Sequence, residues 1–183
     1  RVARNDGRVT TAKGNGRMKV FTVAKGSTGI AGLTRGEREK PVPGPNQVLV
    51  RVRAASLNFR DLAIVNGKYF RGPLLTDTIP LSDGAGEVET VGAAVQGLKP
   101  GDRVVATFSQ GEPPQALGSP LDGMLAEYAV FEPAGLLRVP DHMSFEAAAT
   151  LPCAGVTAWN ALFWGRRLLP GEGRDQSISS RAA

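Results

Sequence analysis

Apolar and polar residues alternate most regularly just after the first quarter of the chain. Val48, Val50 and Val52 would face one side of a strand, and Arg51 and Arg53 the other. This period of two is typical of an antiparallel strand with one buried face. Further strands, bounded by turn residues, are expected over residues 18–23, 79–91, 103–108, 124–131 and 135–139.

The pattern becomes helical in the last third of the chain. Ser144 suits the N-cap of a short helix that ends near residue 150. Trp159 and Phe163 lie at helical spacing and predict a second helix over residues 154–163.

An earlier short helix is expected over residues 58–65. Ser56 and Asn58 are both suitable N-caps, and Asn66-Gly67 is a turn signal that would end it. The many short strands followed by helices predict a mainly β, barrel-like domain. Residues 24–46 and 109–122 are interpreted as loops, the first with a short strand near residues 30–33.

Glycines interrupt the expected strand over residues 79–91. A glycine inside a strand usually marks a bulge or a close approach of another backbone. Gly84 and Gly86 do not form a dinucleotide-binding loop, because Glu89 stands where the third glycine would be needed and a strand pattern continues there.

The net charge of +5 is concentrated at the two ends of the 183 residues. Residues 1–17 carry five basic and one acidic residue, and residues 166–183 carry four and two. The body between them has 13 basic and 14 acidic residues, so no basic face for nucleic acid is expected. Cys153 is the only cysteine, which excludes an internal disulfide. No apolar run reaches the roughly 20 residues that span a bilayer. A soluble cytoplasmic protein without membrane partners is expected.

The order of segments resembles the N-terminal, GroES-like domain of the medium-chain dehydrogenase/reductase superfamily. It is most similar to zinc-independent alcohol-dehydrogenase-like and quinone-oxidoreductase-like members. The matching segments cover about residues 18–172 and are Pro45–Val52, Ala54–Asp61, Leu81–Val88, Lys99–Val104, Ala126–Tyr128 and Ala148–Trp159.

The resemblance argues against a zinc site. In zinc-containing members a cysteine stands at the position of Asn58, a His-Glu pair at Ser82-Asp83, and a second cysteine at Cys153. Catalytic zinc needs three nitrogen, sulfur or carboxylate ligands. Asn58 has an amide and Ser82 a hydroxyl where zinc-containing members have ligands, so only Cys153 matches a ligand and no metal is expected. Cys153 is interpreted as a buried, inert thiol.

The resemblance also implies the roles of the site residues. The reaction would be hydride transfer between NAD(P) and a carbonyl, alcohol, conjugated alkene or quinone. Asn58 and Asp61 would be catalytic, Phe59 and Tyr69 would bind the substrate, and Thr157 would touch the cofactor. Taken alone, Asn58 and Asp61 could equally be a helix cap and a first-turn acid, and Thr157 an ordinary helix residue.

Three parts are expected along the chain. Residues 1–17 would be a disordered or artefactual extension, residues 18–165 the GroES-like catalytic domain with the start of a linker helix, and residues 166–183 a truncated, disordered tail. The resemblance implies a C-terminal Rossmann domain, which this chain lacks because the tail has no buried-strand pattern.

The expected function follows from these parts. The 183 residues would be the catalytic domain of an NAD(P)-dependent oxidoreductase acting on a small molecule. They would be inactive alone and would not bind the cofactor tightly, and a homodimer would form only at full length. The alternative is a cofactor-free binding or co-chaperonin-like barrel module, since fold does not fix function.

Overall fold

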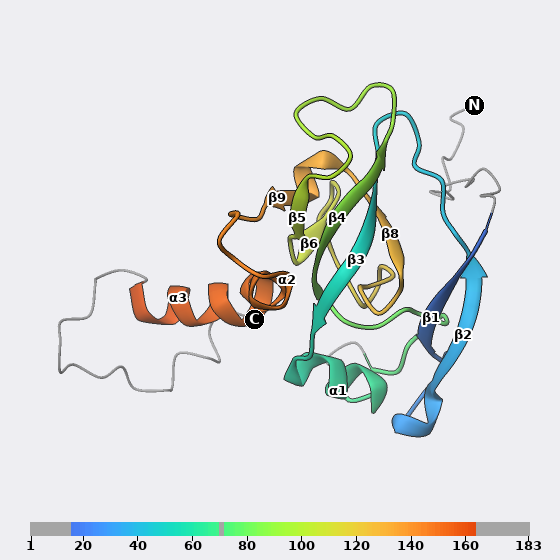
Figure 1. The fold of residues 1–183 in the computed structure, drawn as a ribbon. Helices are drawn as coiled ribbons and strands as arrows, with labels where there is room; N and C mark the ends of the chain where they lie inside the picture. Colours follow the sequence, from blue (N-terminus) through green and yellow to red (C-terminus); the bar gives the residue numbers. More distant parts are fainter. Residues whose placement is uncertain (1–15, 70–71, 164–183) are drawn as a thin grey trace, which may run out of the picture.

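The computed structural model describes residues 16–69 and 72–163 (Figure 1). The predictions of an extension over residues 1–17, apart from its last two residues, and of a tail over residues 166–183 lie outside this part of the chain.

A five-stranded antiparallel sheet forms the body of the fold, in the order β8-β3-β4-β5-β9. Its strands are β3 (Val48–Ser56), β4 (Asp83–Val91), β5 (Arg103–Ala106), β8 (Tyr128–Phe131) and β9 (Leu136–Arg138). The alternation around residue 50 therefore predicted the long strand β3 correctly. The mainly β fold class is confirmed for the described residues.

The glycines in β4 mark the irregularities expected of them. The pairing of β3 with β4 shifts register twice, and one shift lies between Val52 and Ala54, opposite Gly86 and Ala85. A Cβ on Gly86 would lie 2.2 Å from the carbonyl oxygen of Arg51. Gly86 thus lets β3 approach β4 closely at a bulge.

A two-stranded hairpin lies beside the sheet and corrects the loop expected over residues 24–46. It pairs β1 (Arg17–Val23) with β2 (Leu33–Glu39), and the turn η1 (Ile30–Gly32) precedes β2. The sequence of β2 has no apolar face, and most of its residues are exposed. Its strand conformation comes from backbone pairing with β1, so hydrophobic period alone could not find it.

The loop expected over residues 109–122 contains a small hairpin of β6 (Ser109–Gln110) and β7 (Gln115–Ala116). Of the strand predicted over residues 124–131, only β8 (Tyr128–Phe131) forms.

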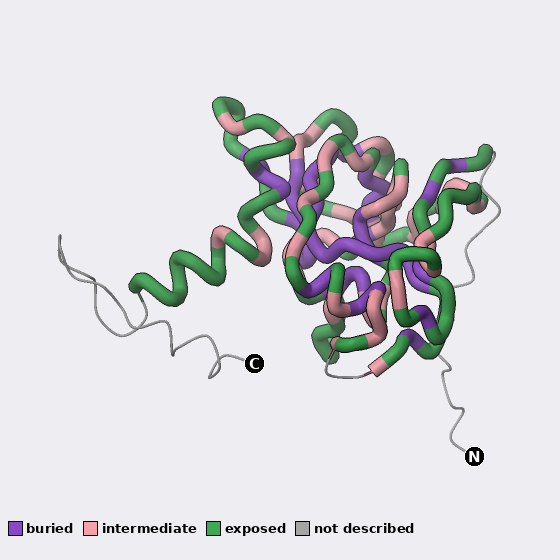
Figure 2. The backbone as a smooth tube through the Cα atoms, turned by 90° about the horizontal axis from the view of Figure 1, so that it is seen from below, coloured by how far each residue is buried: buried purple, intermediate pink, exposed green. Residues whose placement is uncertain are grey.

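The three predicted helices form where the sequence pattern placed them. They are α1 (Phe59–Val65), α2 (Phe145–Ala149) and α3 (Val156–Phe163), and the π-helical turn η3 (Leu151–Gly155) joins the last two. Ser144 caps α2 as expected, because its Oγ accepts a hydrogen bond from the Ala147 amide over 3.1 Å. Helix α3 extends away from the sheet and is exposed along its length (Figures 1 and 2).

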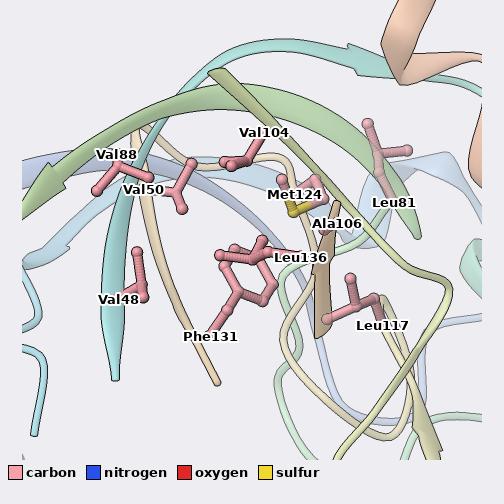
Figure 3. Packing of buried hydrophobic residues seen from close by; sticks show 10 residues of the cluster. All are labelled: Val48, Val50, Leu81, Val88, Val104, Ala106, Leu117, Met124, Phe131 and Leu136. Atoms are coloured by element: carbon pink, nitrogen blue, oxygen red, sulfur yellow. The ribbon is translucent and has the colours of Figure 1, made fainter. Parts of the chain in front are cut away.

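The main core lies against the sheet and is drawn in Figure 3. It consists of Val48, Val50, Leu81, Val88, Val104, Ala106, Leu117, Met124, Phe131 and Leu136. A second cluster packs Ala148 and Ala149 of α2 against Ala85 and Val105 of the sheet. This packing fixes the start of the η3 segment relative to β4. None of the described helices is long and apolar enough to cross a membrane.

Candidate functional site

The site begins at the N-terminus of α1. Asn58 is the N-cap, and its backbone N–H donates to Asp61 Oδ2 over 2.7 Å. An acid three residues after a polar N-cap is the capping-box arrangement, which satisfies a free helix-end N–H group. The structure therefore selects Asn58 rather than Ser56 as the cap and places both predicted catalytic residues together.

Asp83, at the start of β4, joins this helix end to a distant segment. Its Oδ2 accepts a hydrogen bond from Asn58 Nδ2 over 2.9 Å and a second from the Cys153 backbone N–H over 3.2 Å. Asp83 itself has no solvent exposure. One carboxylate oxygen thus connects three segments that are far apart in sequence: the end of α1, the start of β4 and η3.

The two carboxyl groups are held in an environment that disfavours their charge. Asp61 is only 4% exposed. Burial raises the pKa of Asp61, against hydrogen bonding from Asn58 and the charge of Arg60. Burial also raises the pKa of Asp83, against its hydrogen bonds from Asn58 and Cys153. The negative charge of Asp83 raises the pKa of Asp61 further.

Arg60 is the buried cation next to this pair. Its guanidinium donates to the carbonyl oxygens of Leu117, over 2.8 Å, and Ser119, over 2.7 Å. It lies 4.9 Å from the ring centre of Tyr69 and 5.1 Å from that of Phe108. Arg60 therefore anchors the segment after β7 to α1 and stacks with the predicted substrate-binding Tyr69.

Cys153 carries a neutral thiol at ordinary pH. Burial raises its pKa, and the negative charge of Asp83 raises it further, while Arg60 opposes this. A raised pKa is the opposite of what a nucleophilic cysteine requires. The expected burial of Cys153 is wrong in degree, because its side chain is only partly buried. The Thr157 side chain interacts with this thiol, so Thr157, on the exposed helix α3, lies beside the site.

Phe59 is exposed beside Asn58, and a described cavity lies apart from this centre. Phe59 is 85% exposed, so the described residues do not enclose it in a pocket. A cavity of about 930 Å³ lies against β8 and the β6–β7 hairpin, and none of the predicted site residues lines it. Neither this cavity nor a second one of about 370 Å³ is lined by Asn58.

The donor set does not fit zinc. The positions that hold zinc ligands or their neighbour in zinc-containing members are here Asn58, Ser82, Asp83 and Cys153. Of these, only Asp83 and Cys153 have side chains that commonly bind zinc. Asp83 Oδ2 already accepts two hydrogen bonds. No group of three or more His, Cys, Asp or Glu side chains that could hold a metal ion occurs among residues 16–69 and 72–163.

Sequence reasoning missed Asp83 and Arg60 as members of the site. Their partners lie 25 or more residues away along the chain, so no local pattern reveals the contacts. The available signal was chemical: an acid and an arginine stand next to segments that are otherwise apolar or glycine-rich, where a charge requires a partner.

Comparison with known proteins identifies the family. The model described as "Alcohol dehydrogenase GroES-like domain" matches residues 44–141, more than half of the chain. The zinc-type alcohol dehydrogenase-like protein of Schizosaccharomyces pombe is 48% identical over 128 residues, which cover 65% of this chain and 37% of that protein. The chloroplast envelope quinone oxidoreductase homolog of Arabidopsis thaliana is 38% identical over 159 residues, 85% of this chain and 45% of that protein.

A solved structure agrees with these relatives. The crystal structure of an NAD-dependent alcohol dehydrogenase superposes with a TM-score of 0.71 at 32% identity and covers 79% of this chain and 46% of that one. The chain thus spans less than half the length of the relatives it matches. It belongs to the alcohol dehydrogenase GroES-like domain family, within the medium-chain dehydrogenase/reductase superfamily of oxidoreductases.

Proposed function

We propose that this chain is the substrate-side catalytic domain of an NAD(P)-dependent oxidoreductase that reduces a carbonyl, conjugated alkene or quinone without zinc. The single observation that carries the proposal is the amide of Asn58, held by Asp83 beside Cys153 and Thr157. Homologous alcohol dehydrogenases and quinone oxidoreductases support the reaction class.

Asn58 would act on the oxygen of the substrate. An amide NH₂ group has two hydrogens, and Asp83 accepts only one of them, so the second can donate to a substrate oxygen. Negative charge develops on that oxygen when hydride adds to the substrate carbon. A fixed hydrogen-bond donor there stabilises the transition state more than the ground state.

The nicotinamide cofactor would supply the hydride. We expect Thr157 to touch it, and the exposure of Thr157 on α3 next to Cys153 supports this expectation. The named strands of the described part all pair antiparallel, so this part holds no βαβ unit for a pyrophosphate. We therefore expect these 183 residues alone to turn over no substrate.

The test uses the natural gene product that contains these residues, whatever its length. NADH or NADPH oxidation is followed with aldehydes, enones and quinones as acceptors. Asn58→Ala should lower kcat/KM by about 100-fold, the effect of removing one donor to a developing oxyanion. It should leave the cofactor Kd unchanged.

Asn66→Ala is the matched control. Asn66 lies at the other end of the same helix and bonds only its own helix, through Nδ2 to the Leu62 carbonyl over 2.7 Å. It should change kcat/KM little. A gene product that oxidises neither cofactor with any of these acceptors would contradict the proposal, as would an Asn58→Ala variant with normal kcat/KM.

The absence of zinc has its own measurement. Protein purified from zinc-supplemented medium should contain far less than one zinc per chain, and a chelator should leave its kcat unchanged. A full equivalent of zinc whose removal abolishes turnover would show that ligands other than those described form a metal site.

A further inference from the structure

Asp83 stands out because it is fully buried yet serves residues that would meet the substrate. One of its oxygens, Oδ2, receives both the Asn58 side-chain amide and the Cys153 backbone N–H. The other, Oδ1, is buried and has no hydrogen-bond partner among the described residues. Burying a carboxylate is costly, so its retention here suggests a task beyond packing.

The chemistry of the Asp83–Asn58 contact fixes the direction of the Asn58 amide. An ionised carboxylate only accepts hydrogen bonds, whereas an amide has one donating and one accepting end. Asn58 must therefore turn Nδ2 toward Asp83, as the 2.9 Å contact shows. A neutral amide oxygen in place of the carboxylate would accept this hydrogen bond more weakly and would hold the Asn58 amide less firmly.

We propose that Asp83 is the positioning residue of the site: its carboxylate sets which atoms of the Asn58 amide face the substrate. Its second contact, to the Cys153 N–H, ties this orientation to η3 and therefore to the helix that carries Thr157. The catalytic meaning of the proposal rests on the proposed function, but the geometric claim does not.

Asp83→Asn is the discriminating variant because it keeps the shape and removes the charge. The Cys153 N–H keeps the oxygen of the new amide at the place of Oδ2, but a neutral amide oxygen accepts from Asn58 Nδ2 more weakly than a carboxylate, so the orientation is held less firmly. We expect kcat to fall on the order of 10- to 100-fold, as when a reacting group loses its orienting partner. The melting temperature should not fall in parallel, whereas a purely structural role would lower both together.

A double-mutant cycle tests whether Asp83 acts through Asn58. In the Asn58→Ala background, Asp83→Asn should lower kcat no further, because the group that it orients is gone. Full additivity of the two losses would overturn the proposal. Asp102→Asn is the matched control, since Asp102 also accepts two hydrogen bonds, from Lys99 and Arg138, in the turn before β5. It should leave kcat unchanged.

A measurement without turnover separates this inference from the proposed function. The 183-residue chain, labelled with ¹⁵N at asparagine, gives few side-chain NH₂ signals, and Asn58→Ser identifies the one from Asn58. Asp83→Asn should shift that signal and speed the solvent exchange of its bonded proton, while Asp102→Asn should do neither.

The outcomes are distinct. A shifted Asn58 signal in the 183-residue chain, together with a natural gene product that shows no turnover, would support the positioning role and refute the oxidoreductase function. An Asn58 signal that Asp83→Asn leaves unchanged would overturn the positioning role, whatever the activity.

Discussion

Asp61 and Asp83 are acids in a place where water does not solvate their charge. The protein stabilises them only in part, through hydrogen bonds from Asn58 and Cys153 and through the charge of Arg60. Burial outweighs these effects, so both pKa values are raised above the ordinary value of 3.8. This has a consequence for stability that can be measured.

The stability of the protein should depend on the charge state of Asp83. Because its folded-state pKa is raised, the folded state binds the proton more tightly than the unfolded state. Protonated Asp83 therefore adds to the free energy of unfolding. This stabilisation is fully present below the unfolded-state pKa and is lost as pH rises through the folded-state pKa. From about pH 4 upward, the free energy of unfolding should therefore fall for the wild type relative to Asp83→Asn, and the difference should then level off. Urea unfolding at a series of pH values measures it.

Glu146 provides a control of the opposite sign. It is an exposed first-turn acid of α2, and hydrogen bonds from its own N–H and from Ser144 lower its pKa from 4.5. Its stabilising effect is present above the unfolded pKa and is lost as pH falls. The wild type should therefore lose stability relative to Glu146→Gln toward low pH. If Asp83→Asn showed the same direction as Glu146→Gln, the burial argument for Asp83 would be wrong.

At the residue scale, local rules predicted the site only where the contacts are local. Asn58 and Asp61 are three residues apart and make a capping-box contact, so the sequence alone could pair them. Asp83 and Arg60 make contacts over 25 and 57 residues of chain. Such contacts exist only once the sheet has formed, which is why spacing could not reveal them.

The strands β3 and β4 illustrate how a single missing side chain shapes an element. At Gly86, a Cβ would meet backbone atoms of Arg51, which cannot move aside without breaking the pairing of the two strands. At Gly84, the atoms nearest to an added Cβ belong instead to the side chain of Met124, at 2.6 to 2.9 Å, and include its Cβ.

Alanine substitutions at three strand glycines should therefore differ in sign and size. Gly86→Ala should destabilise the fold by about 3 kcal/mol or more, since it overpacks against backbone. Gly84→Ala should cost about 1 to 3 kcal/mol, because the end of the Met124 side chain can adjust but its Cβ is fixed to the backbone. Gly36→Ala in β2 meets nothing within 4 Å and should stabilise by up to about 1 kcal/mol through the unfolded state.

Chemical denaturation of the three variants gives the comparison. Equal effects at Gly86 and Gly36 would show that β3 and β4 do not approach as described, and would remove the physical reason for the bulge.

At the element scale, the sequence predicted the strands and helices that bury an apolar face. It did not predict β2, most of whose residues are exposed, or the two-residue strands β6 and β7. These elements are stabilised by backbone pairing with a neighbour, and backbone hydrogen bonds leave no mark in the side-chain pattern.

At the scale of the whole molecule, a buried core contrasts with the exposed helix α3. The core residues lie against the sheet, whereas Val156 and Trp159 on α3 are 60% and 67% exposed. Large exposed apolar side chains on one helix are typical of a surface that contacts another protein segment or a ligand. Cys153, in the η3 turn that leads into α3, connects this helix to Asn58 through Asp83.

The most direct test of the central claim is deuterium transfer from cofactor to product. The natural gene product would be supplied with NADH or NADPH deuterated at the reactive C4 position and with the best carbonyl, enone or quinone acceptor. Where the product carries the hydride on carbon, mass spectrometry should find a single deuterium there, and Asn58→Ala should slow its appearance while Asn66→Ala does not. Product that lacks deuterium, or no product at all, would contradict hydride transfer at this site and would favour a cofactor-free binding module.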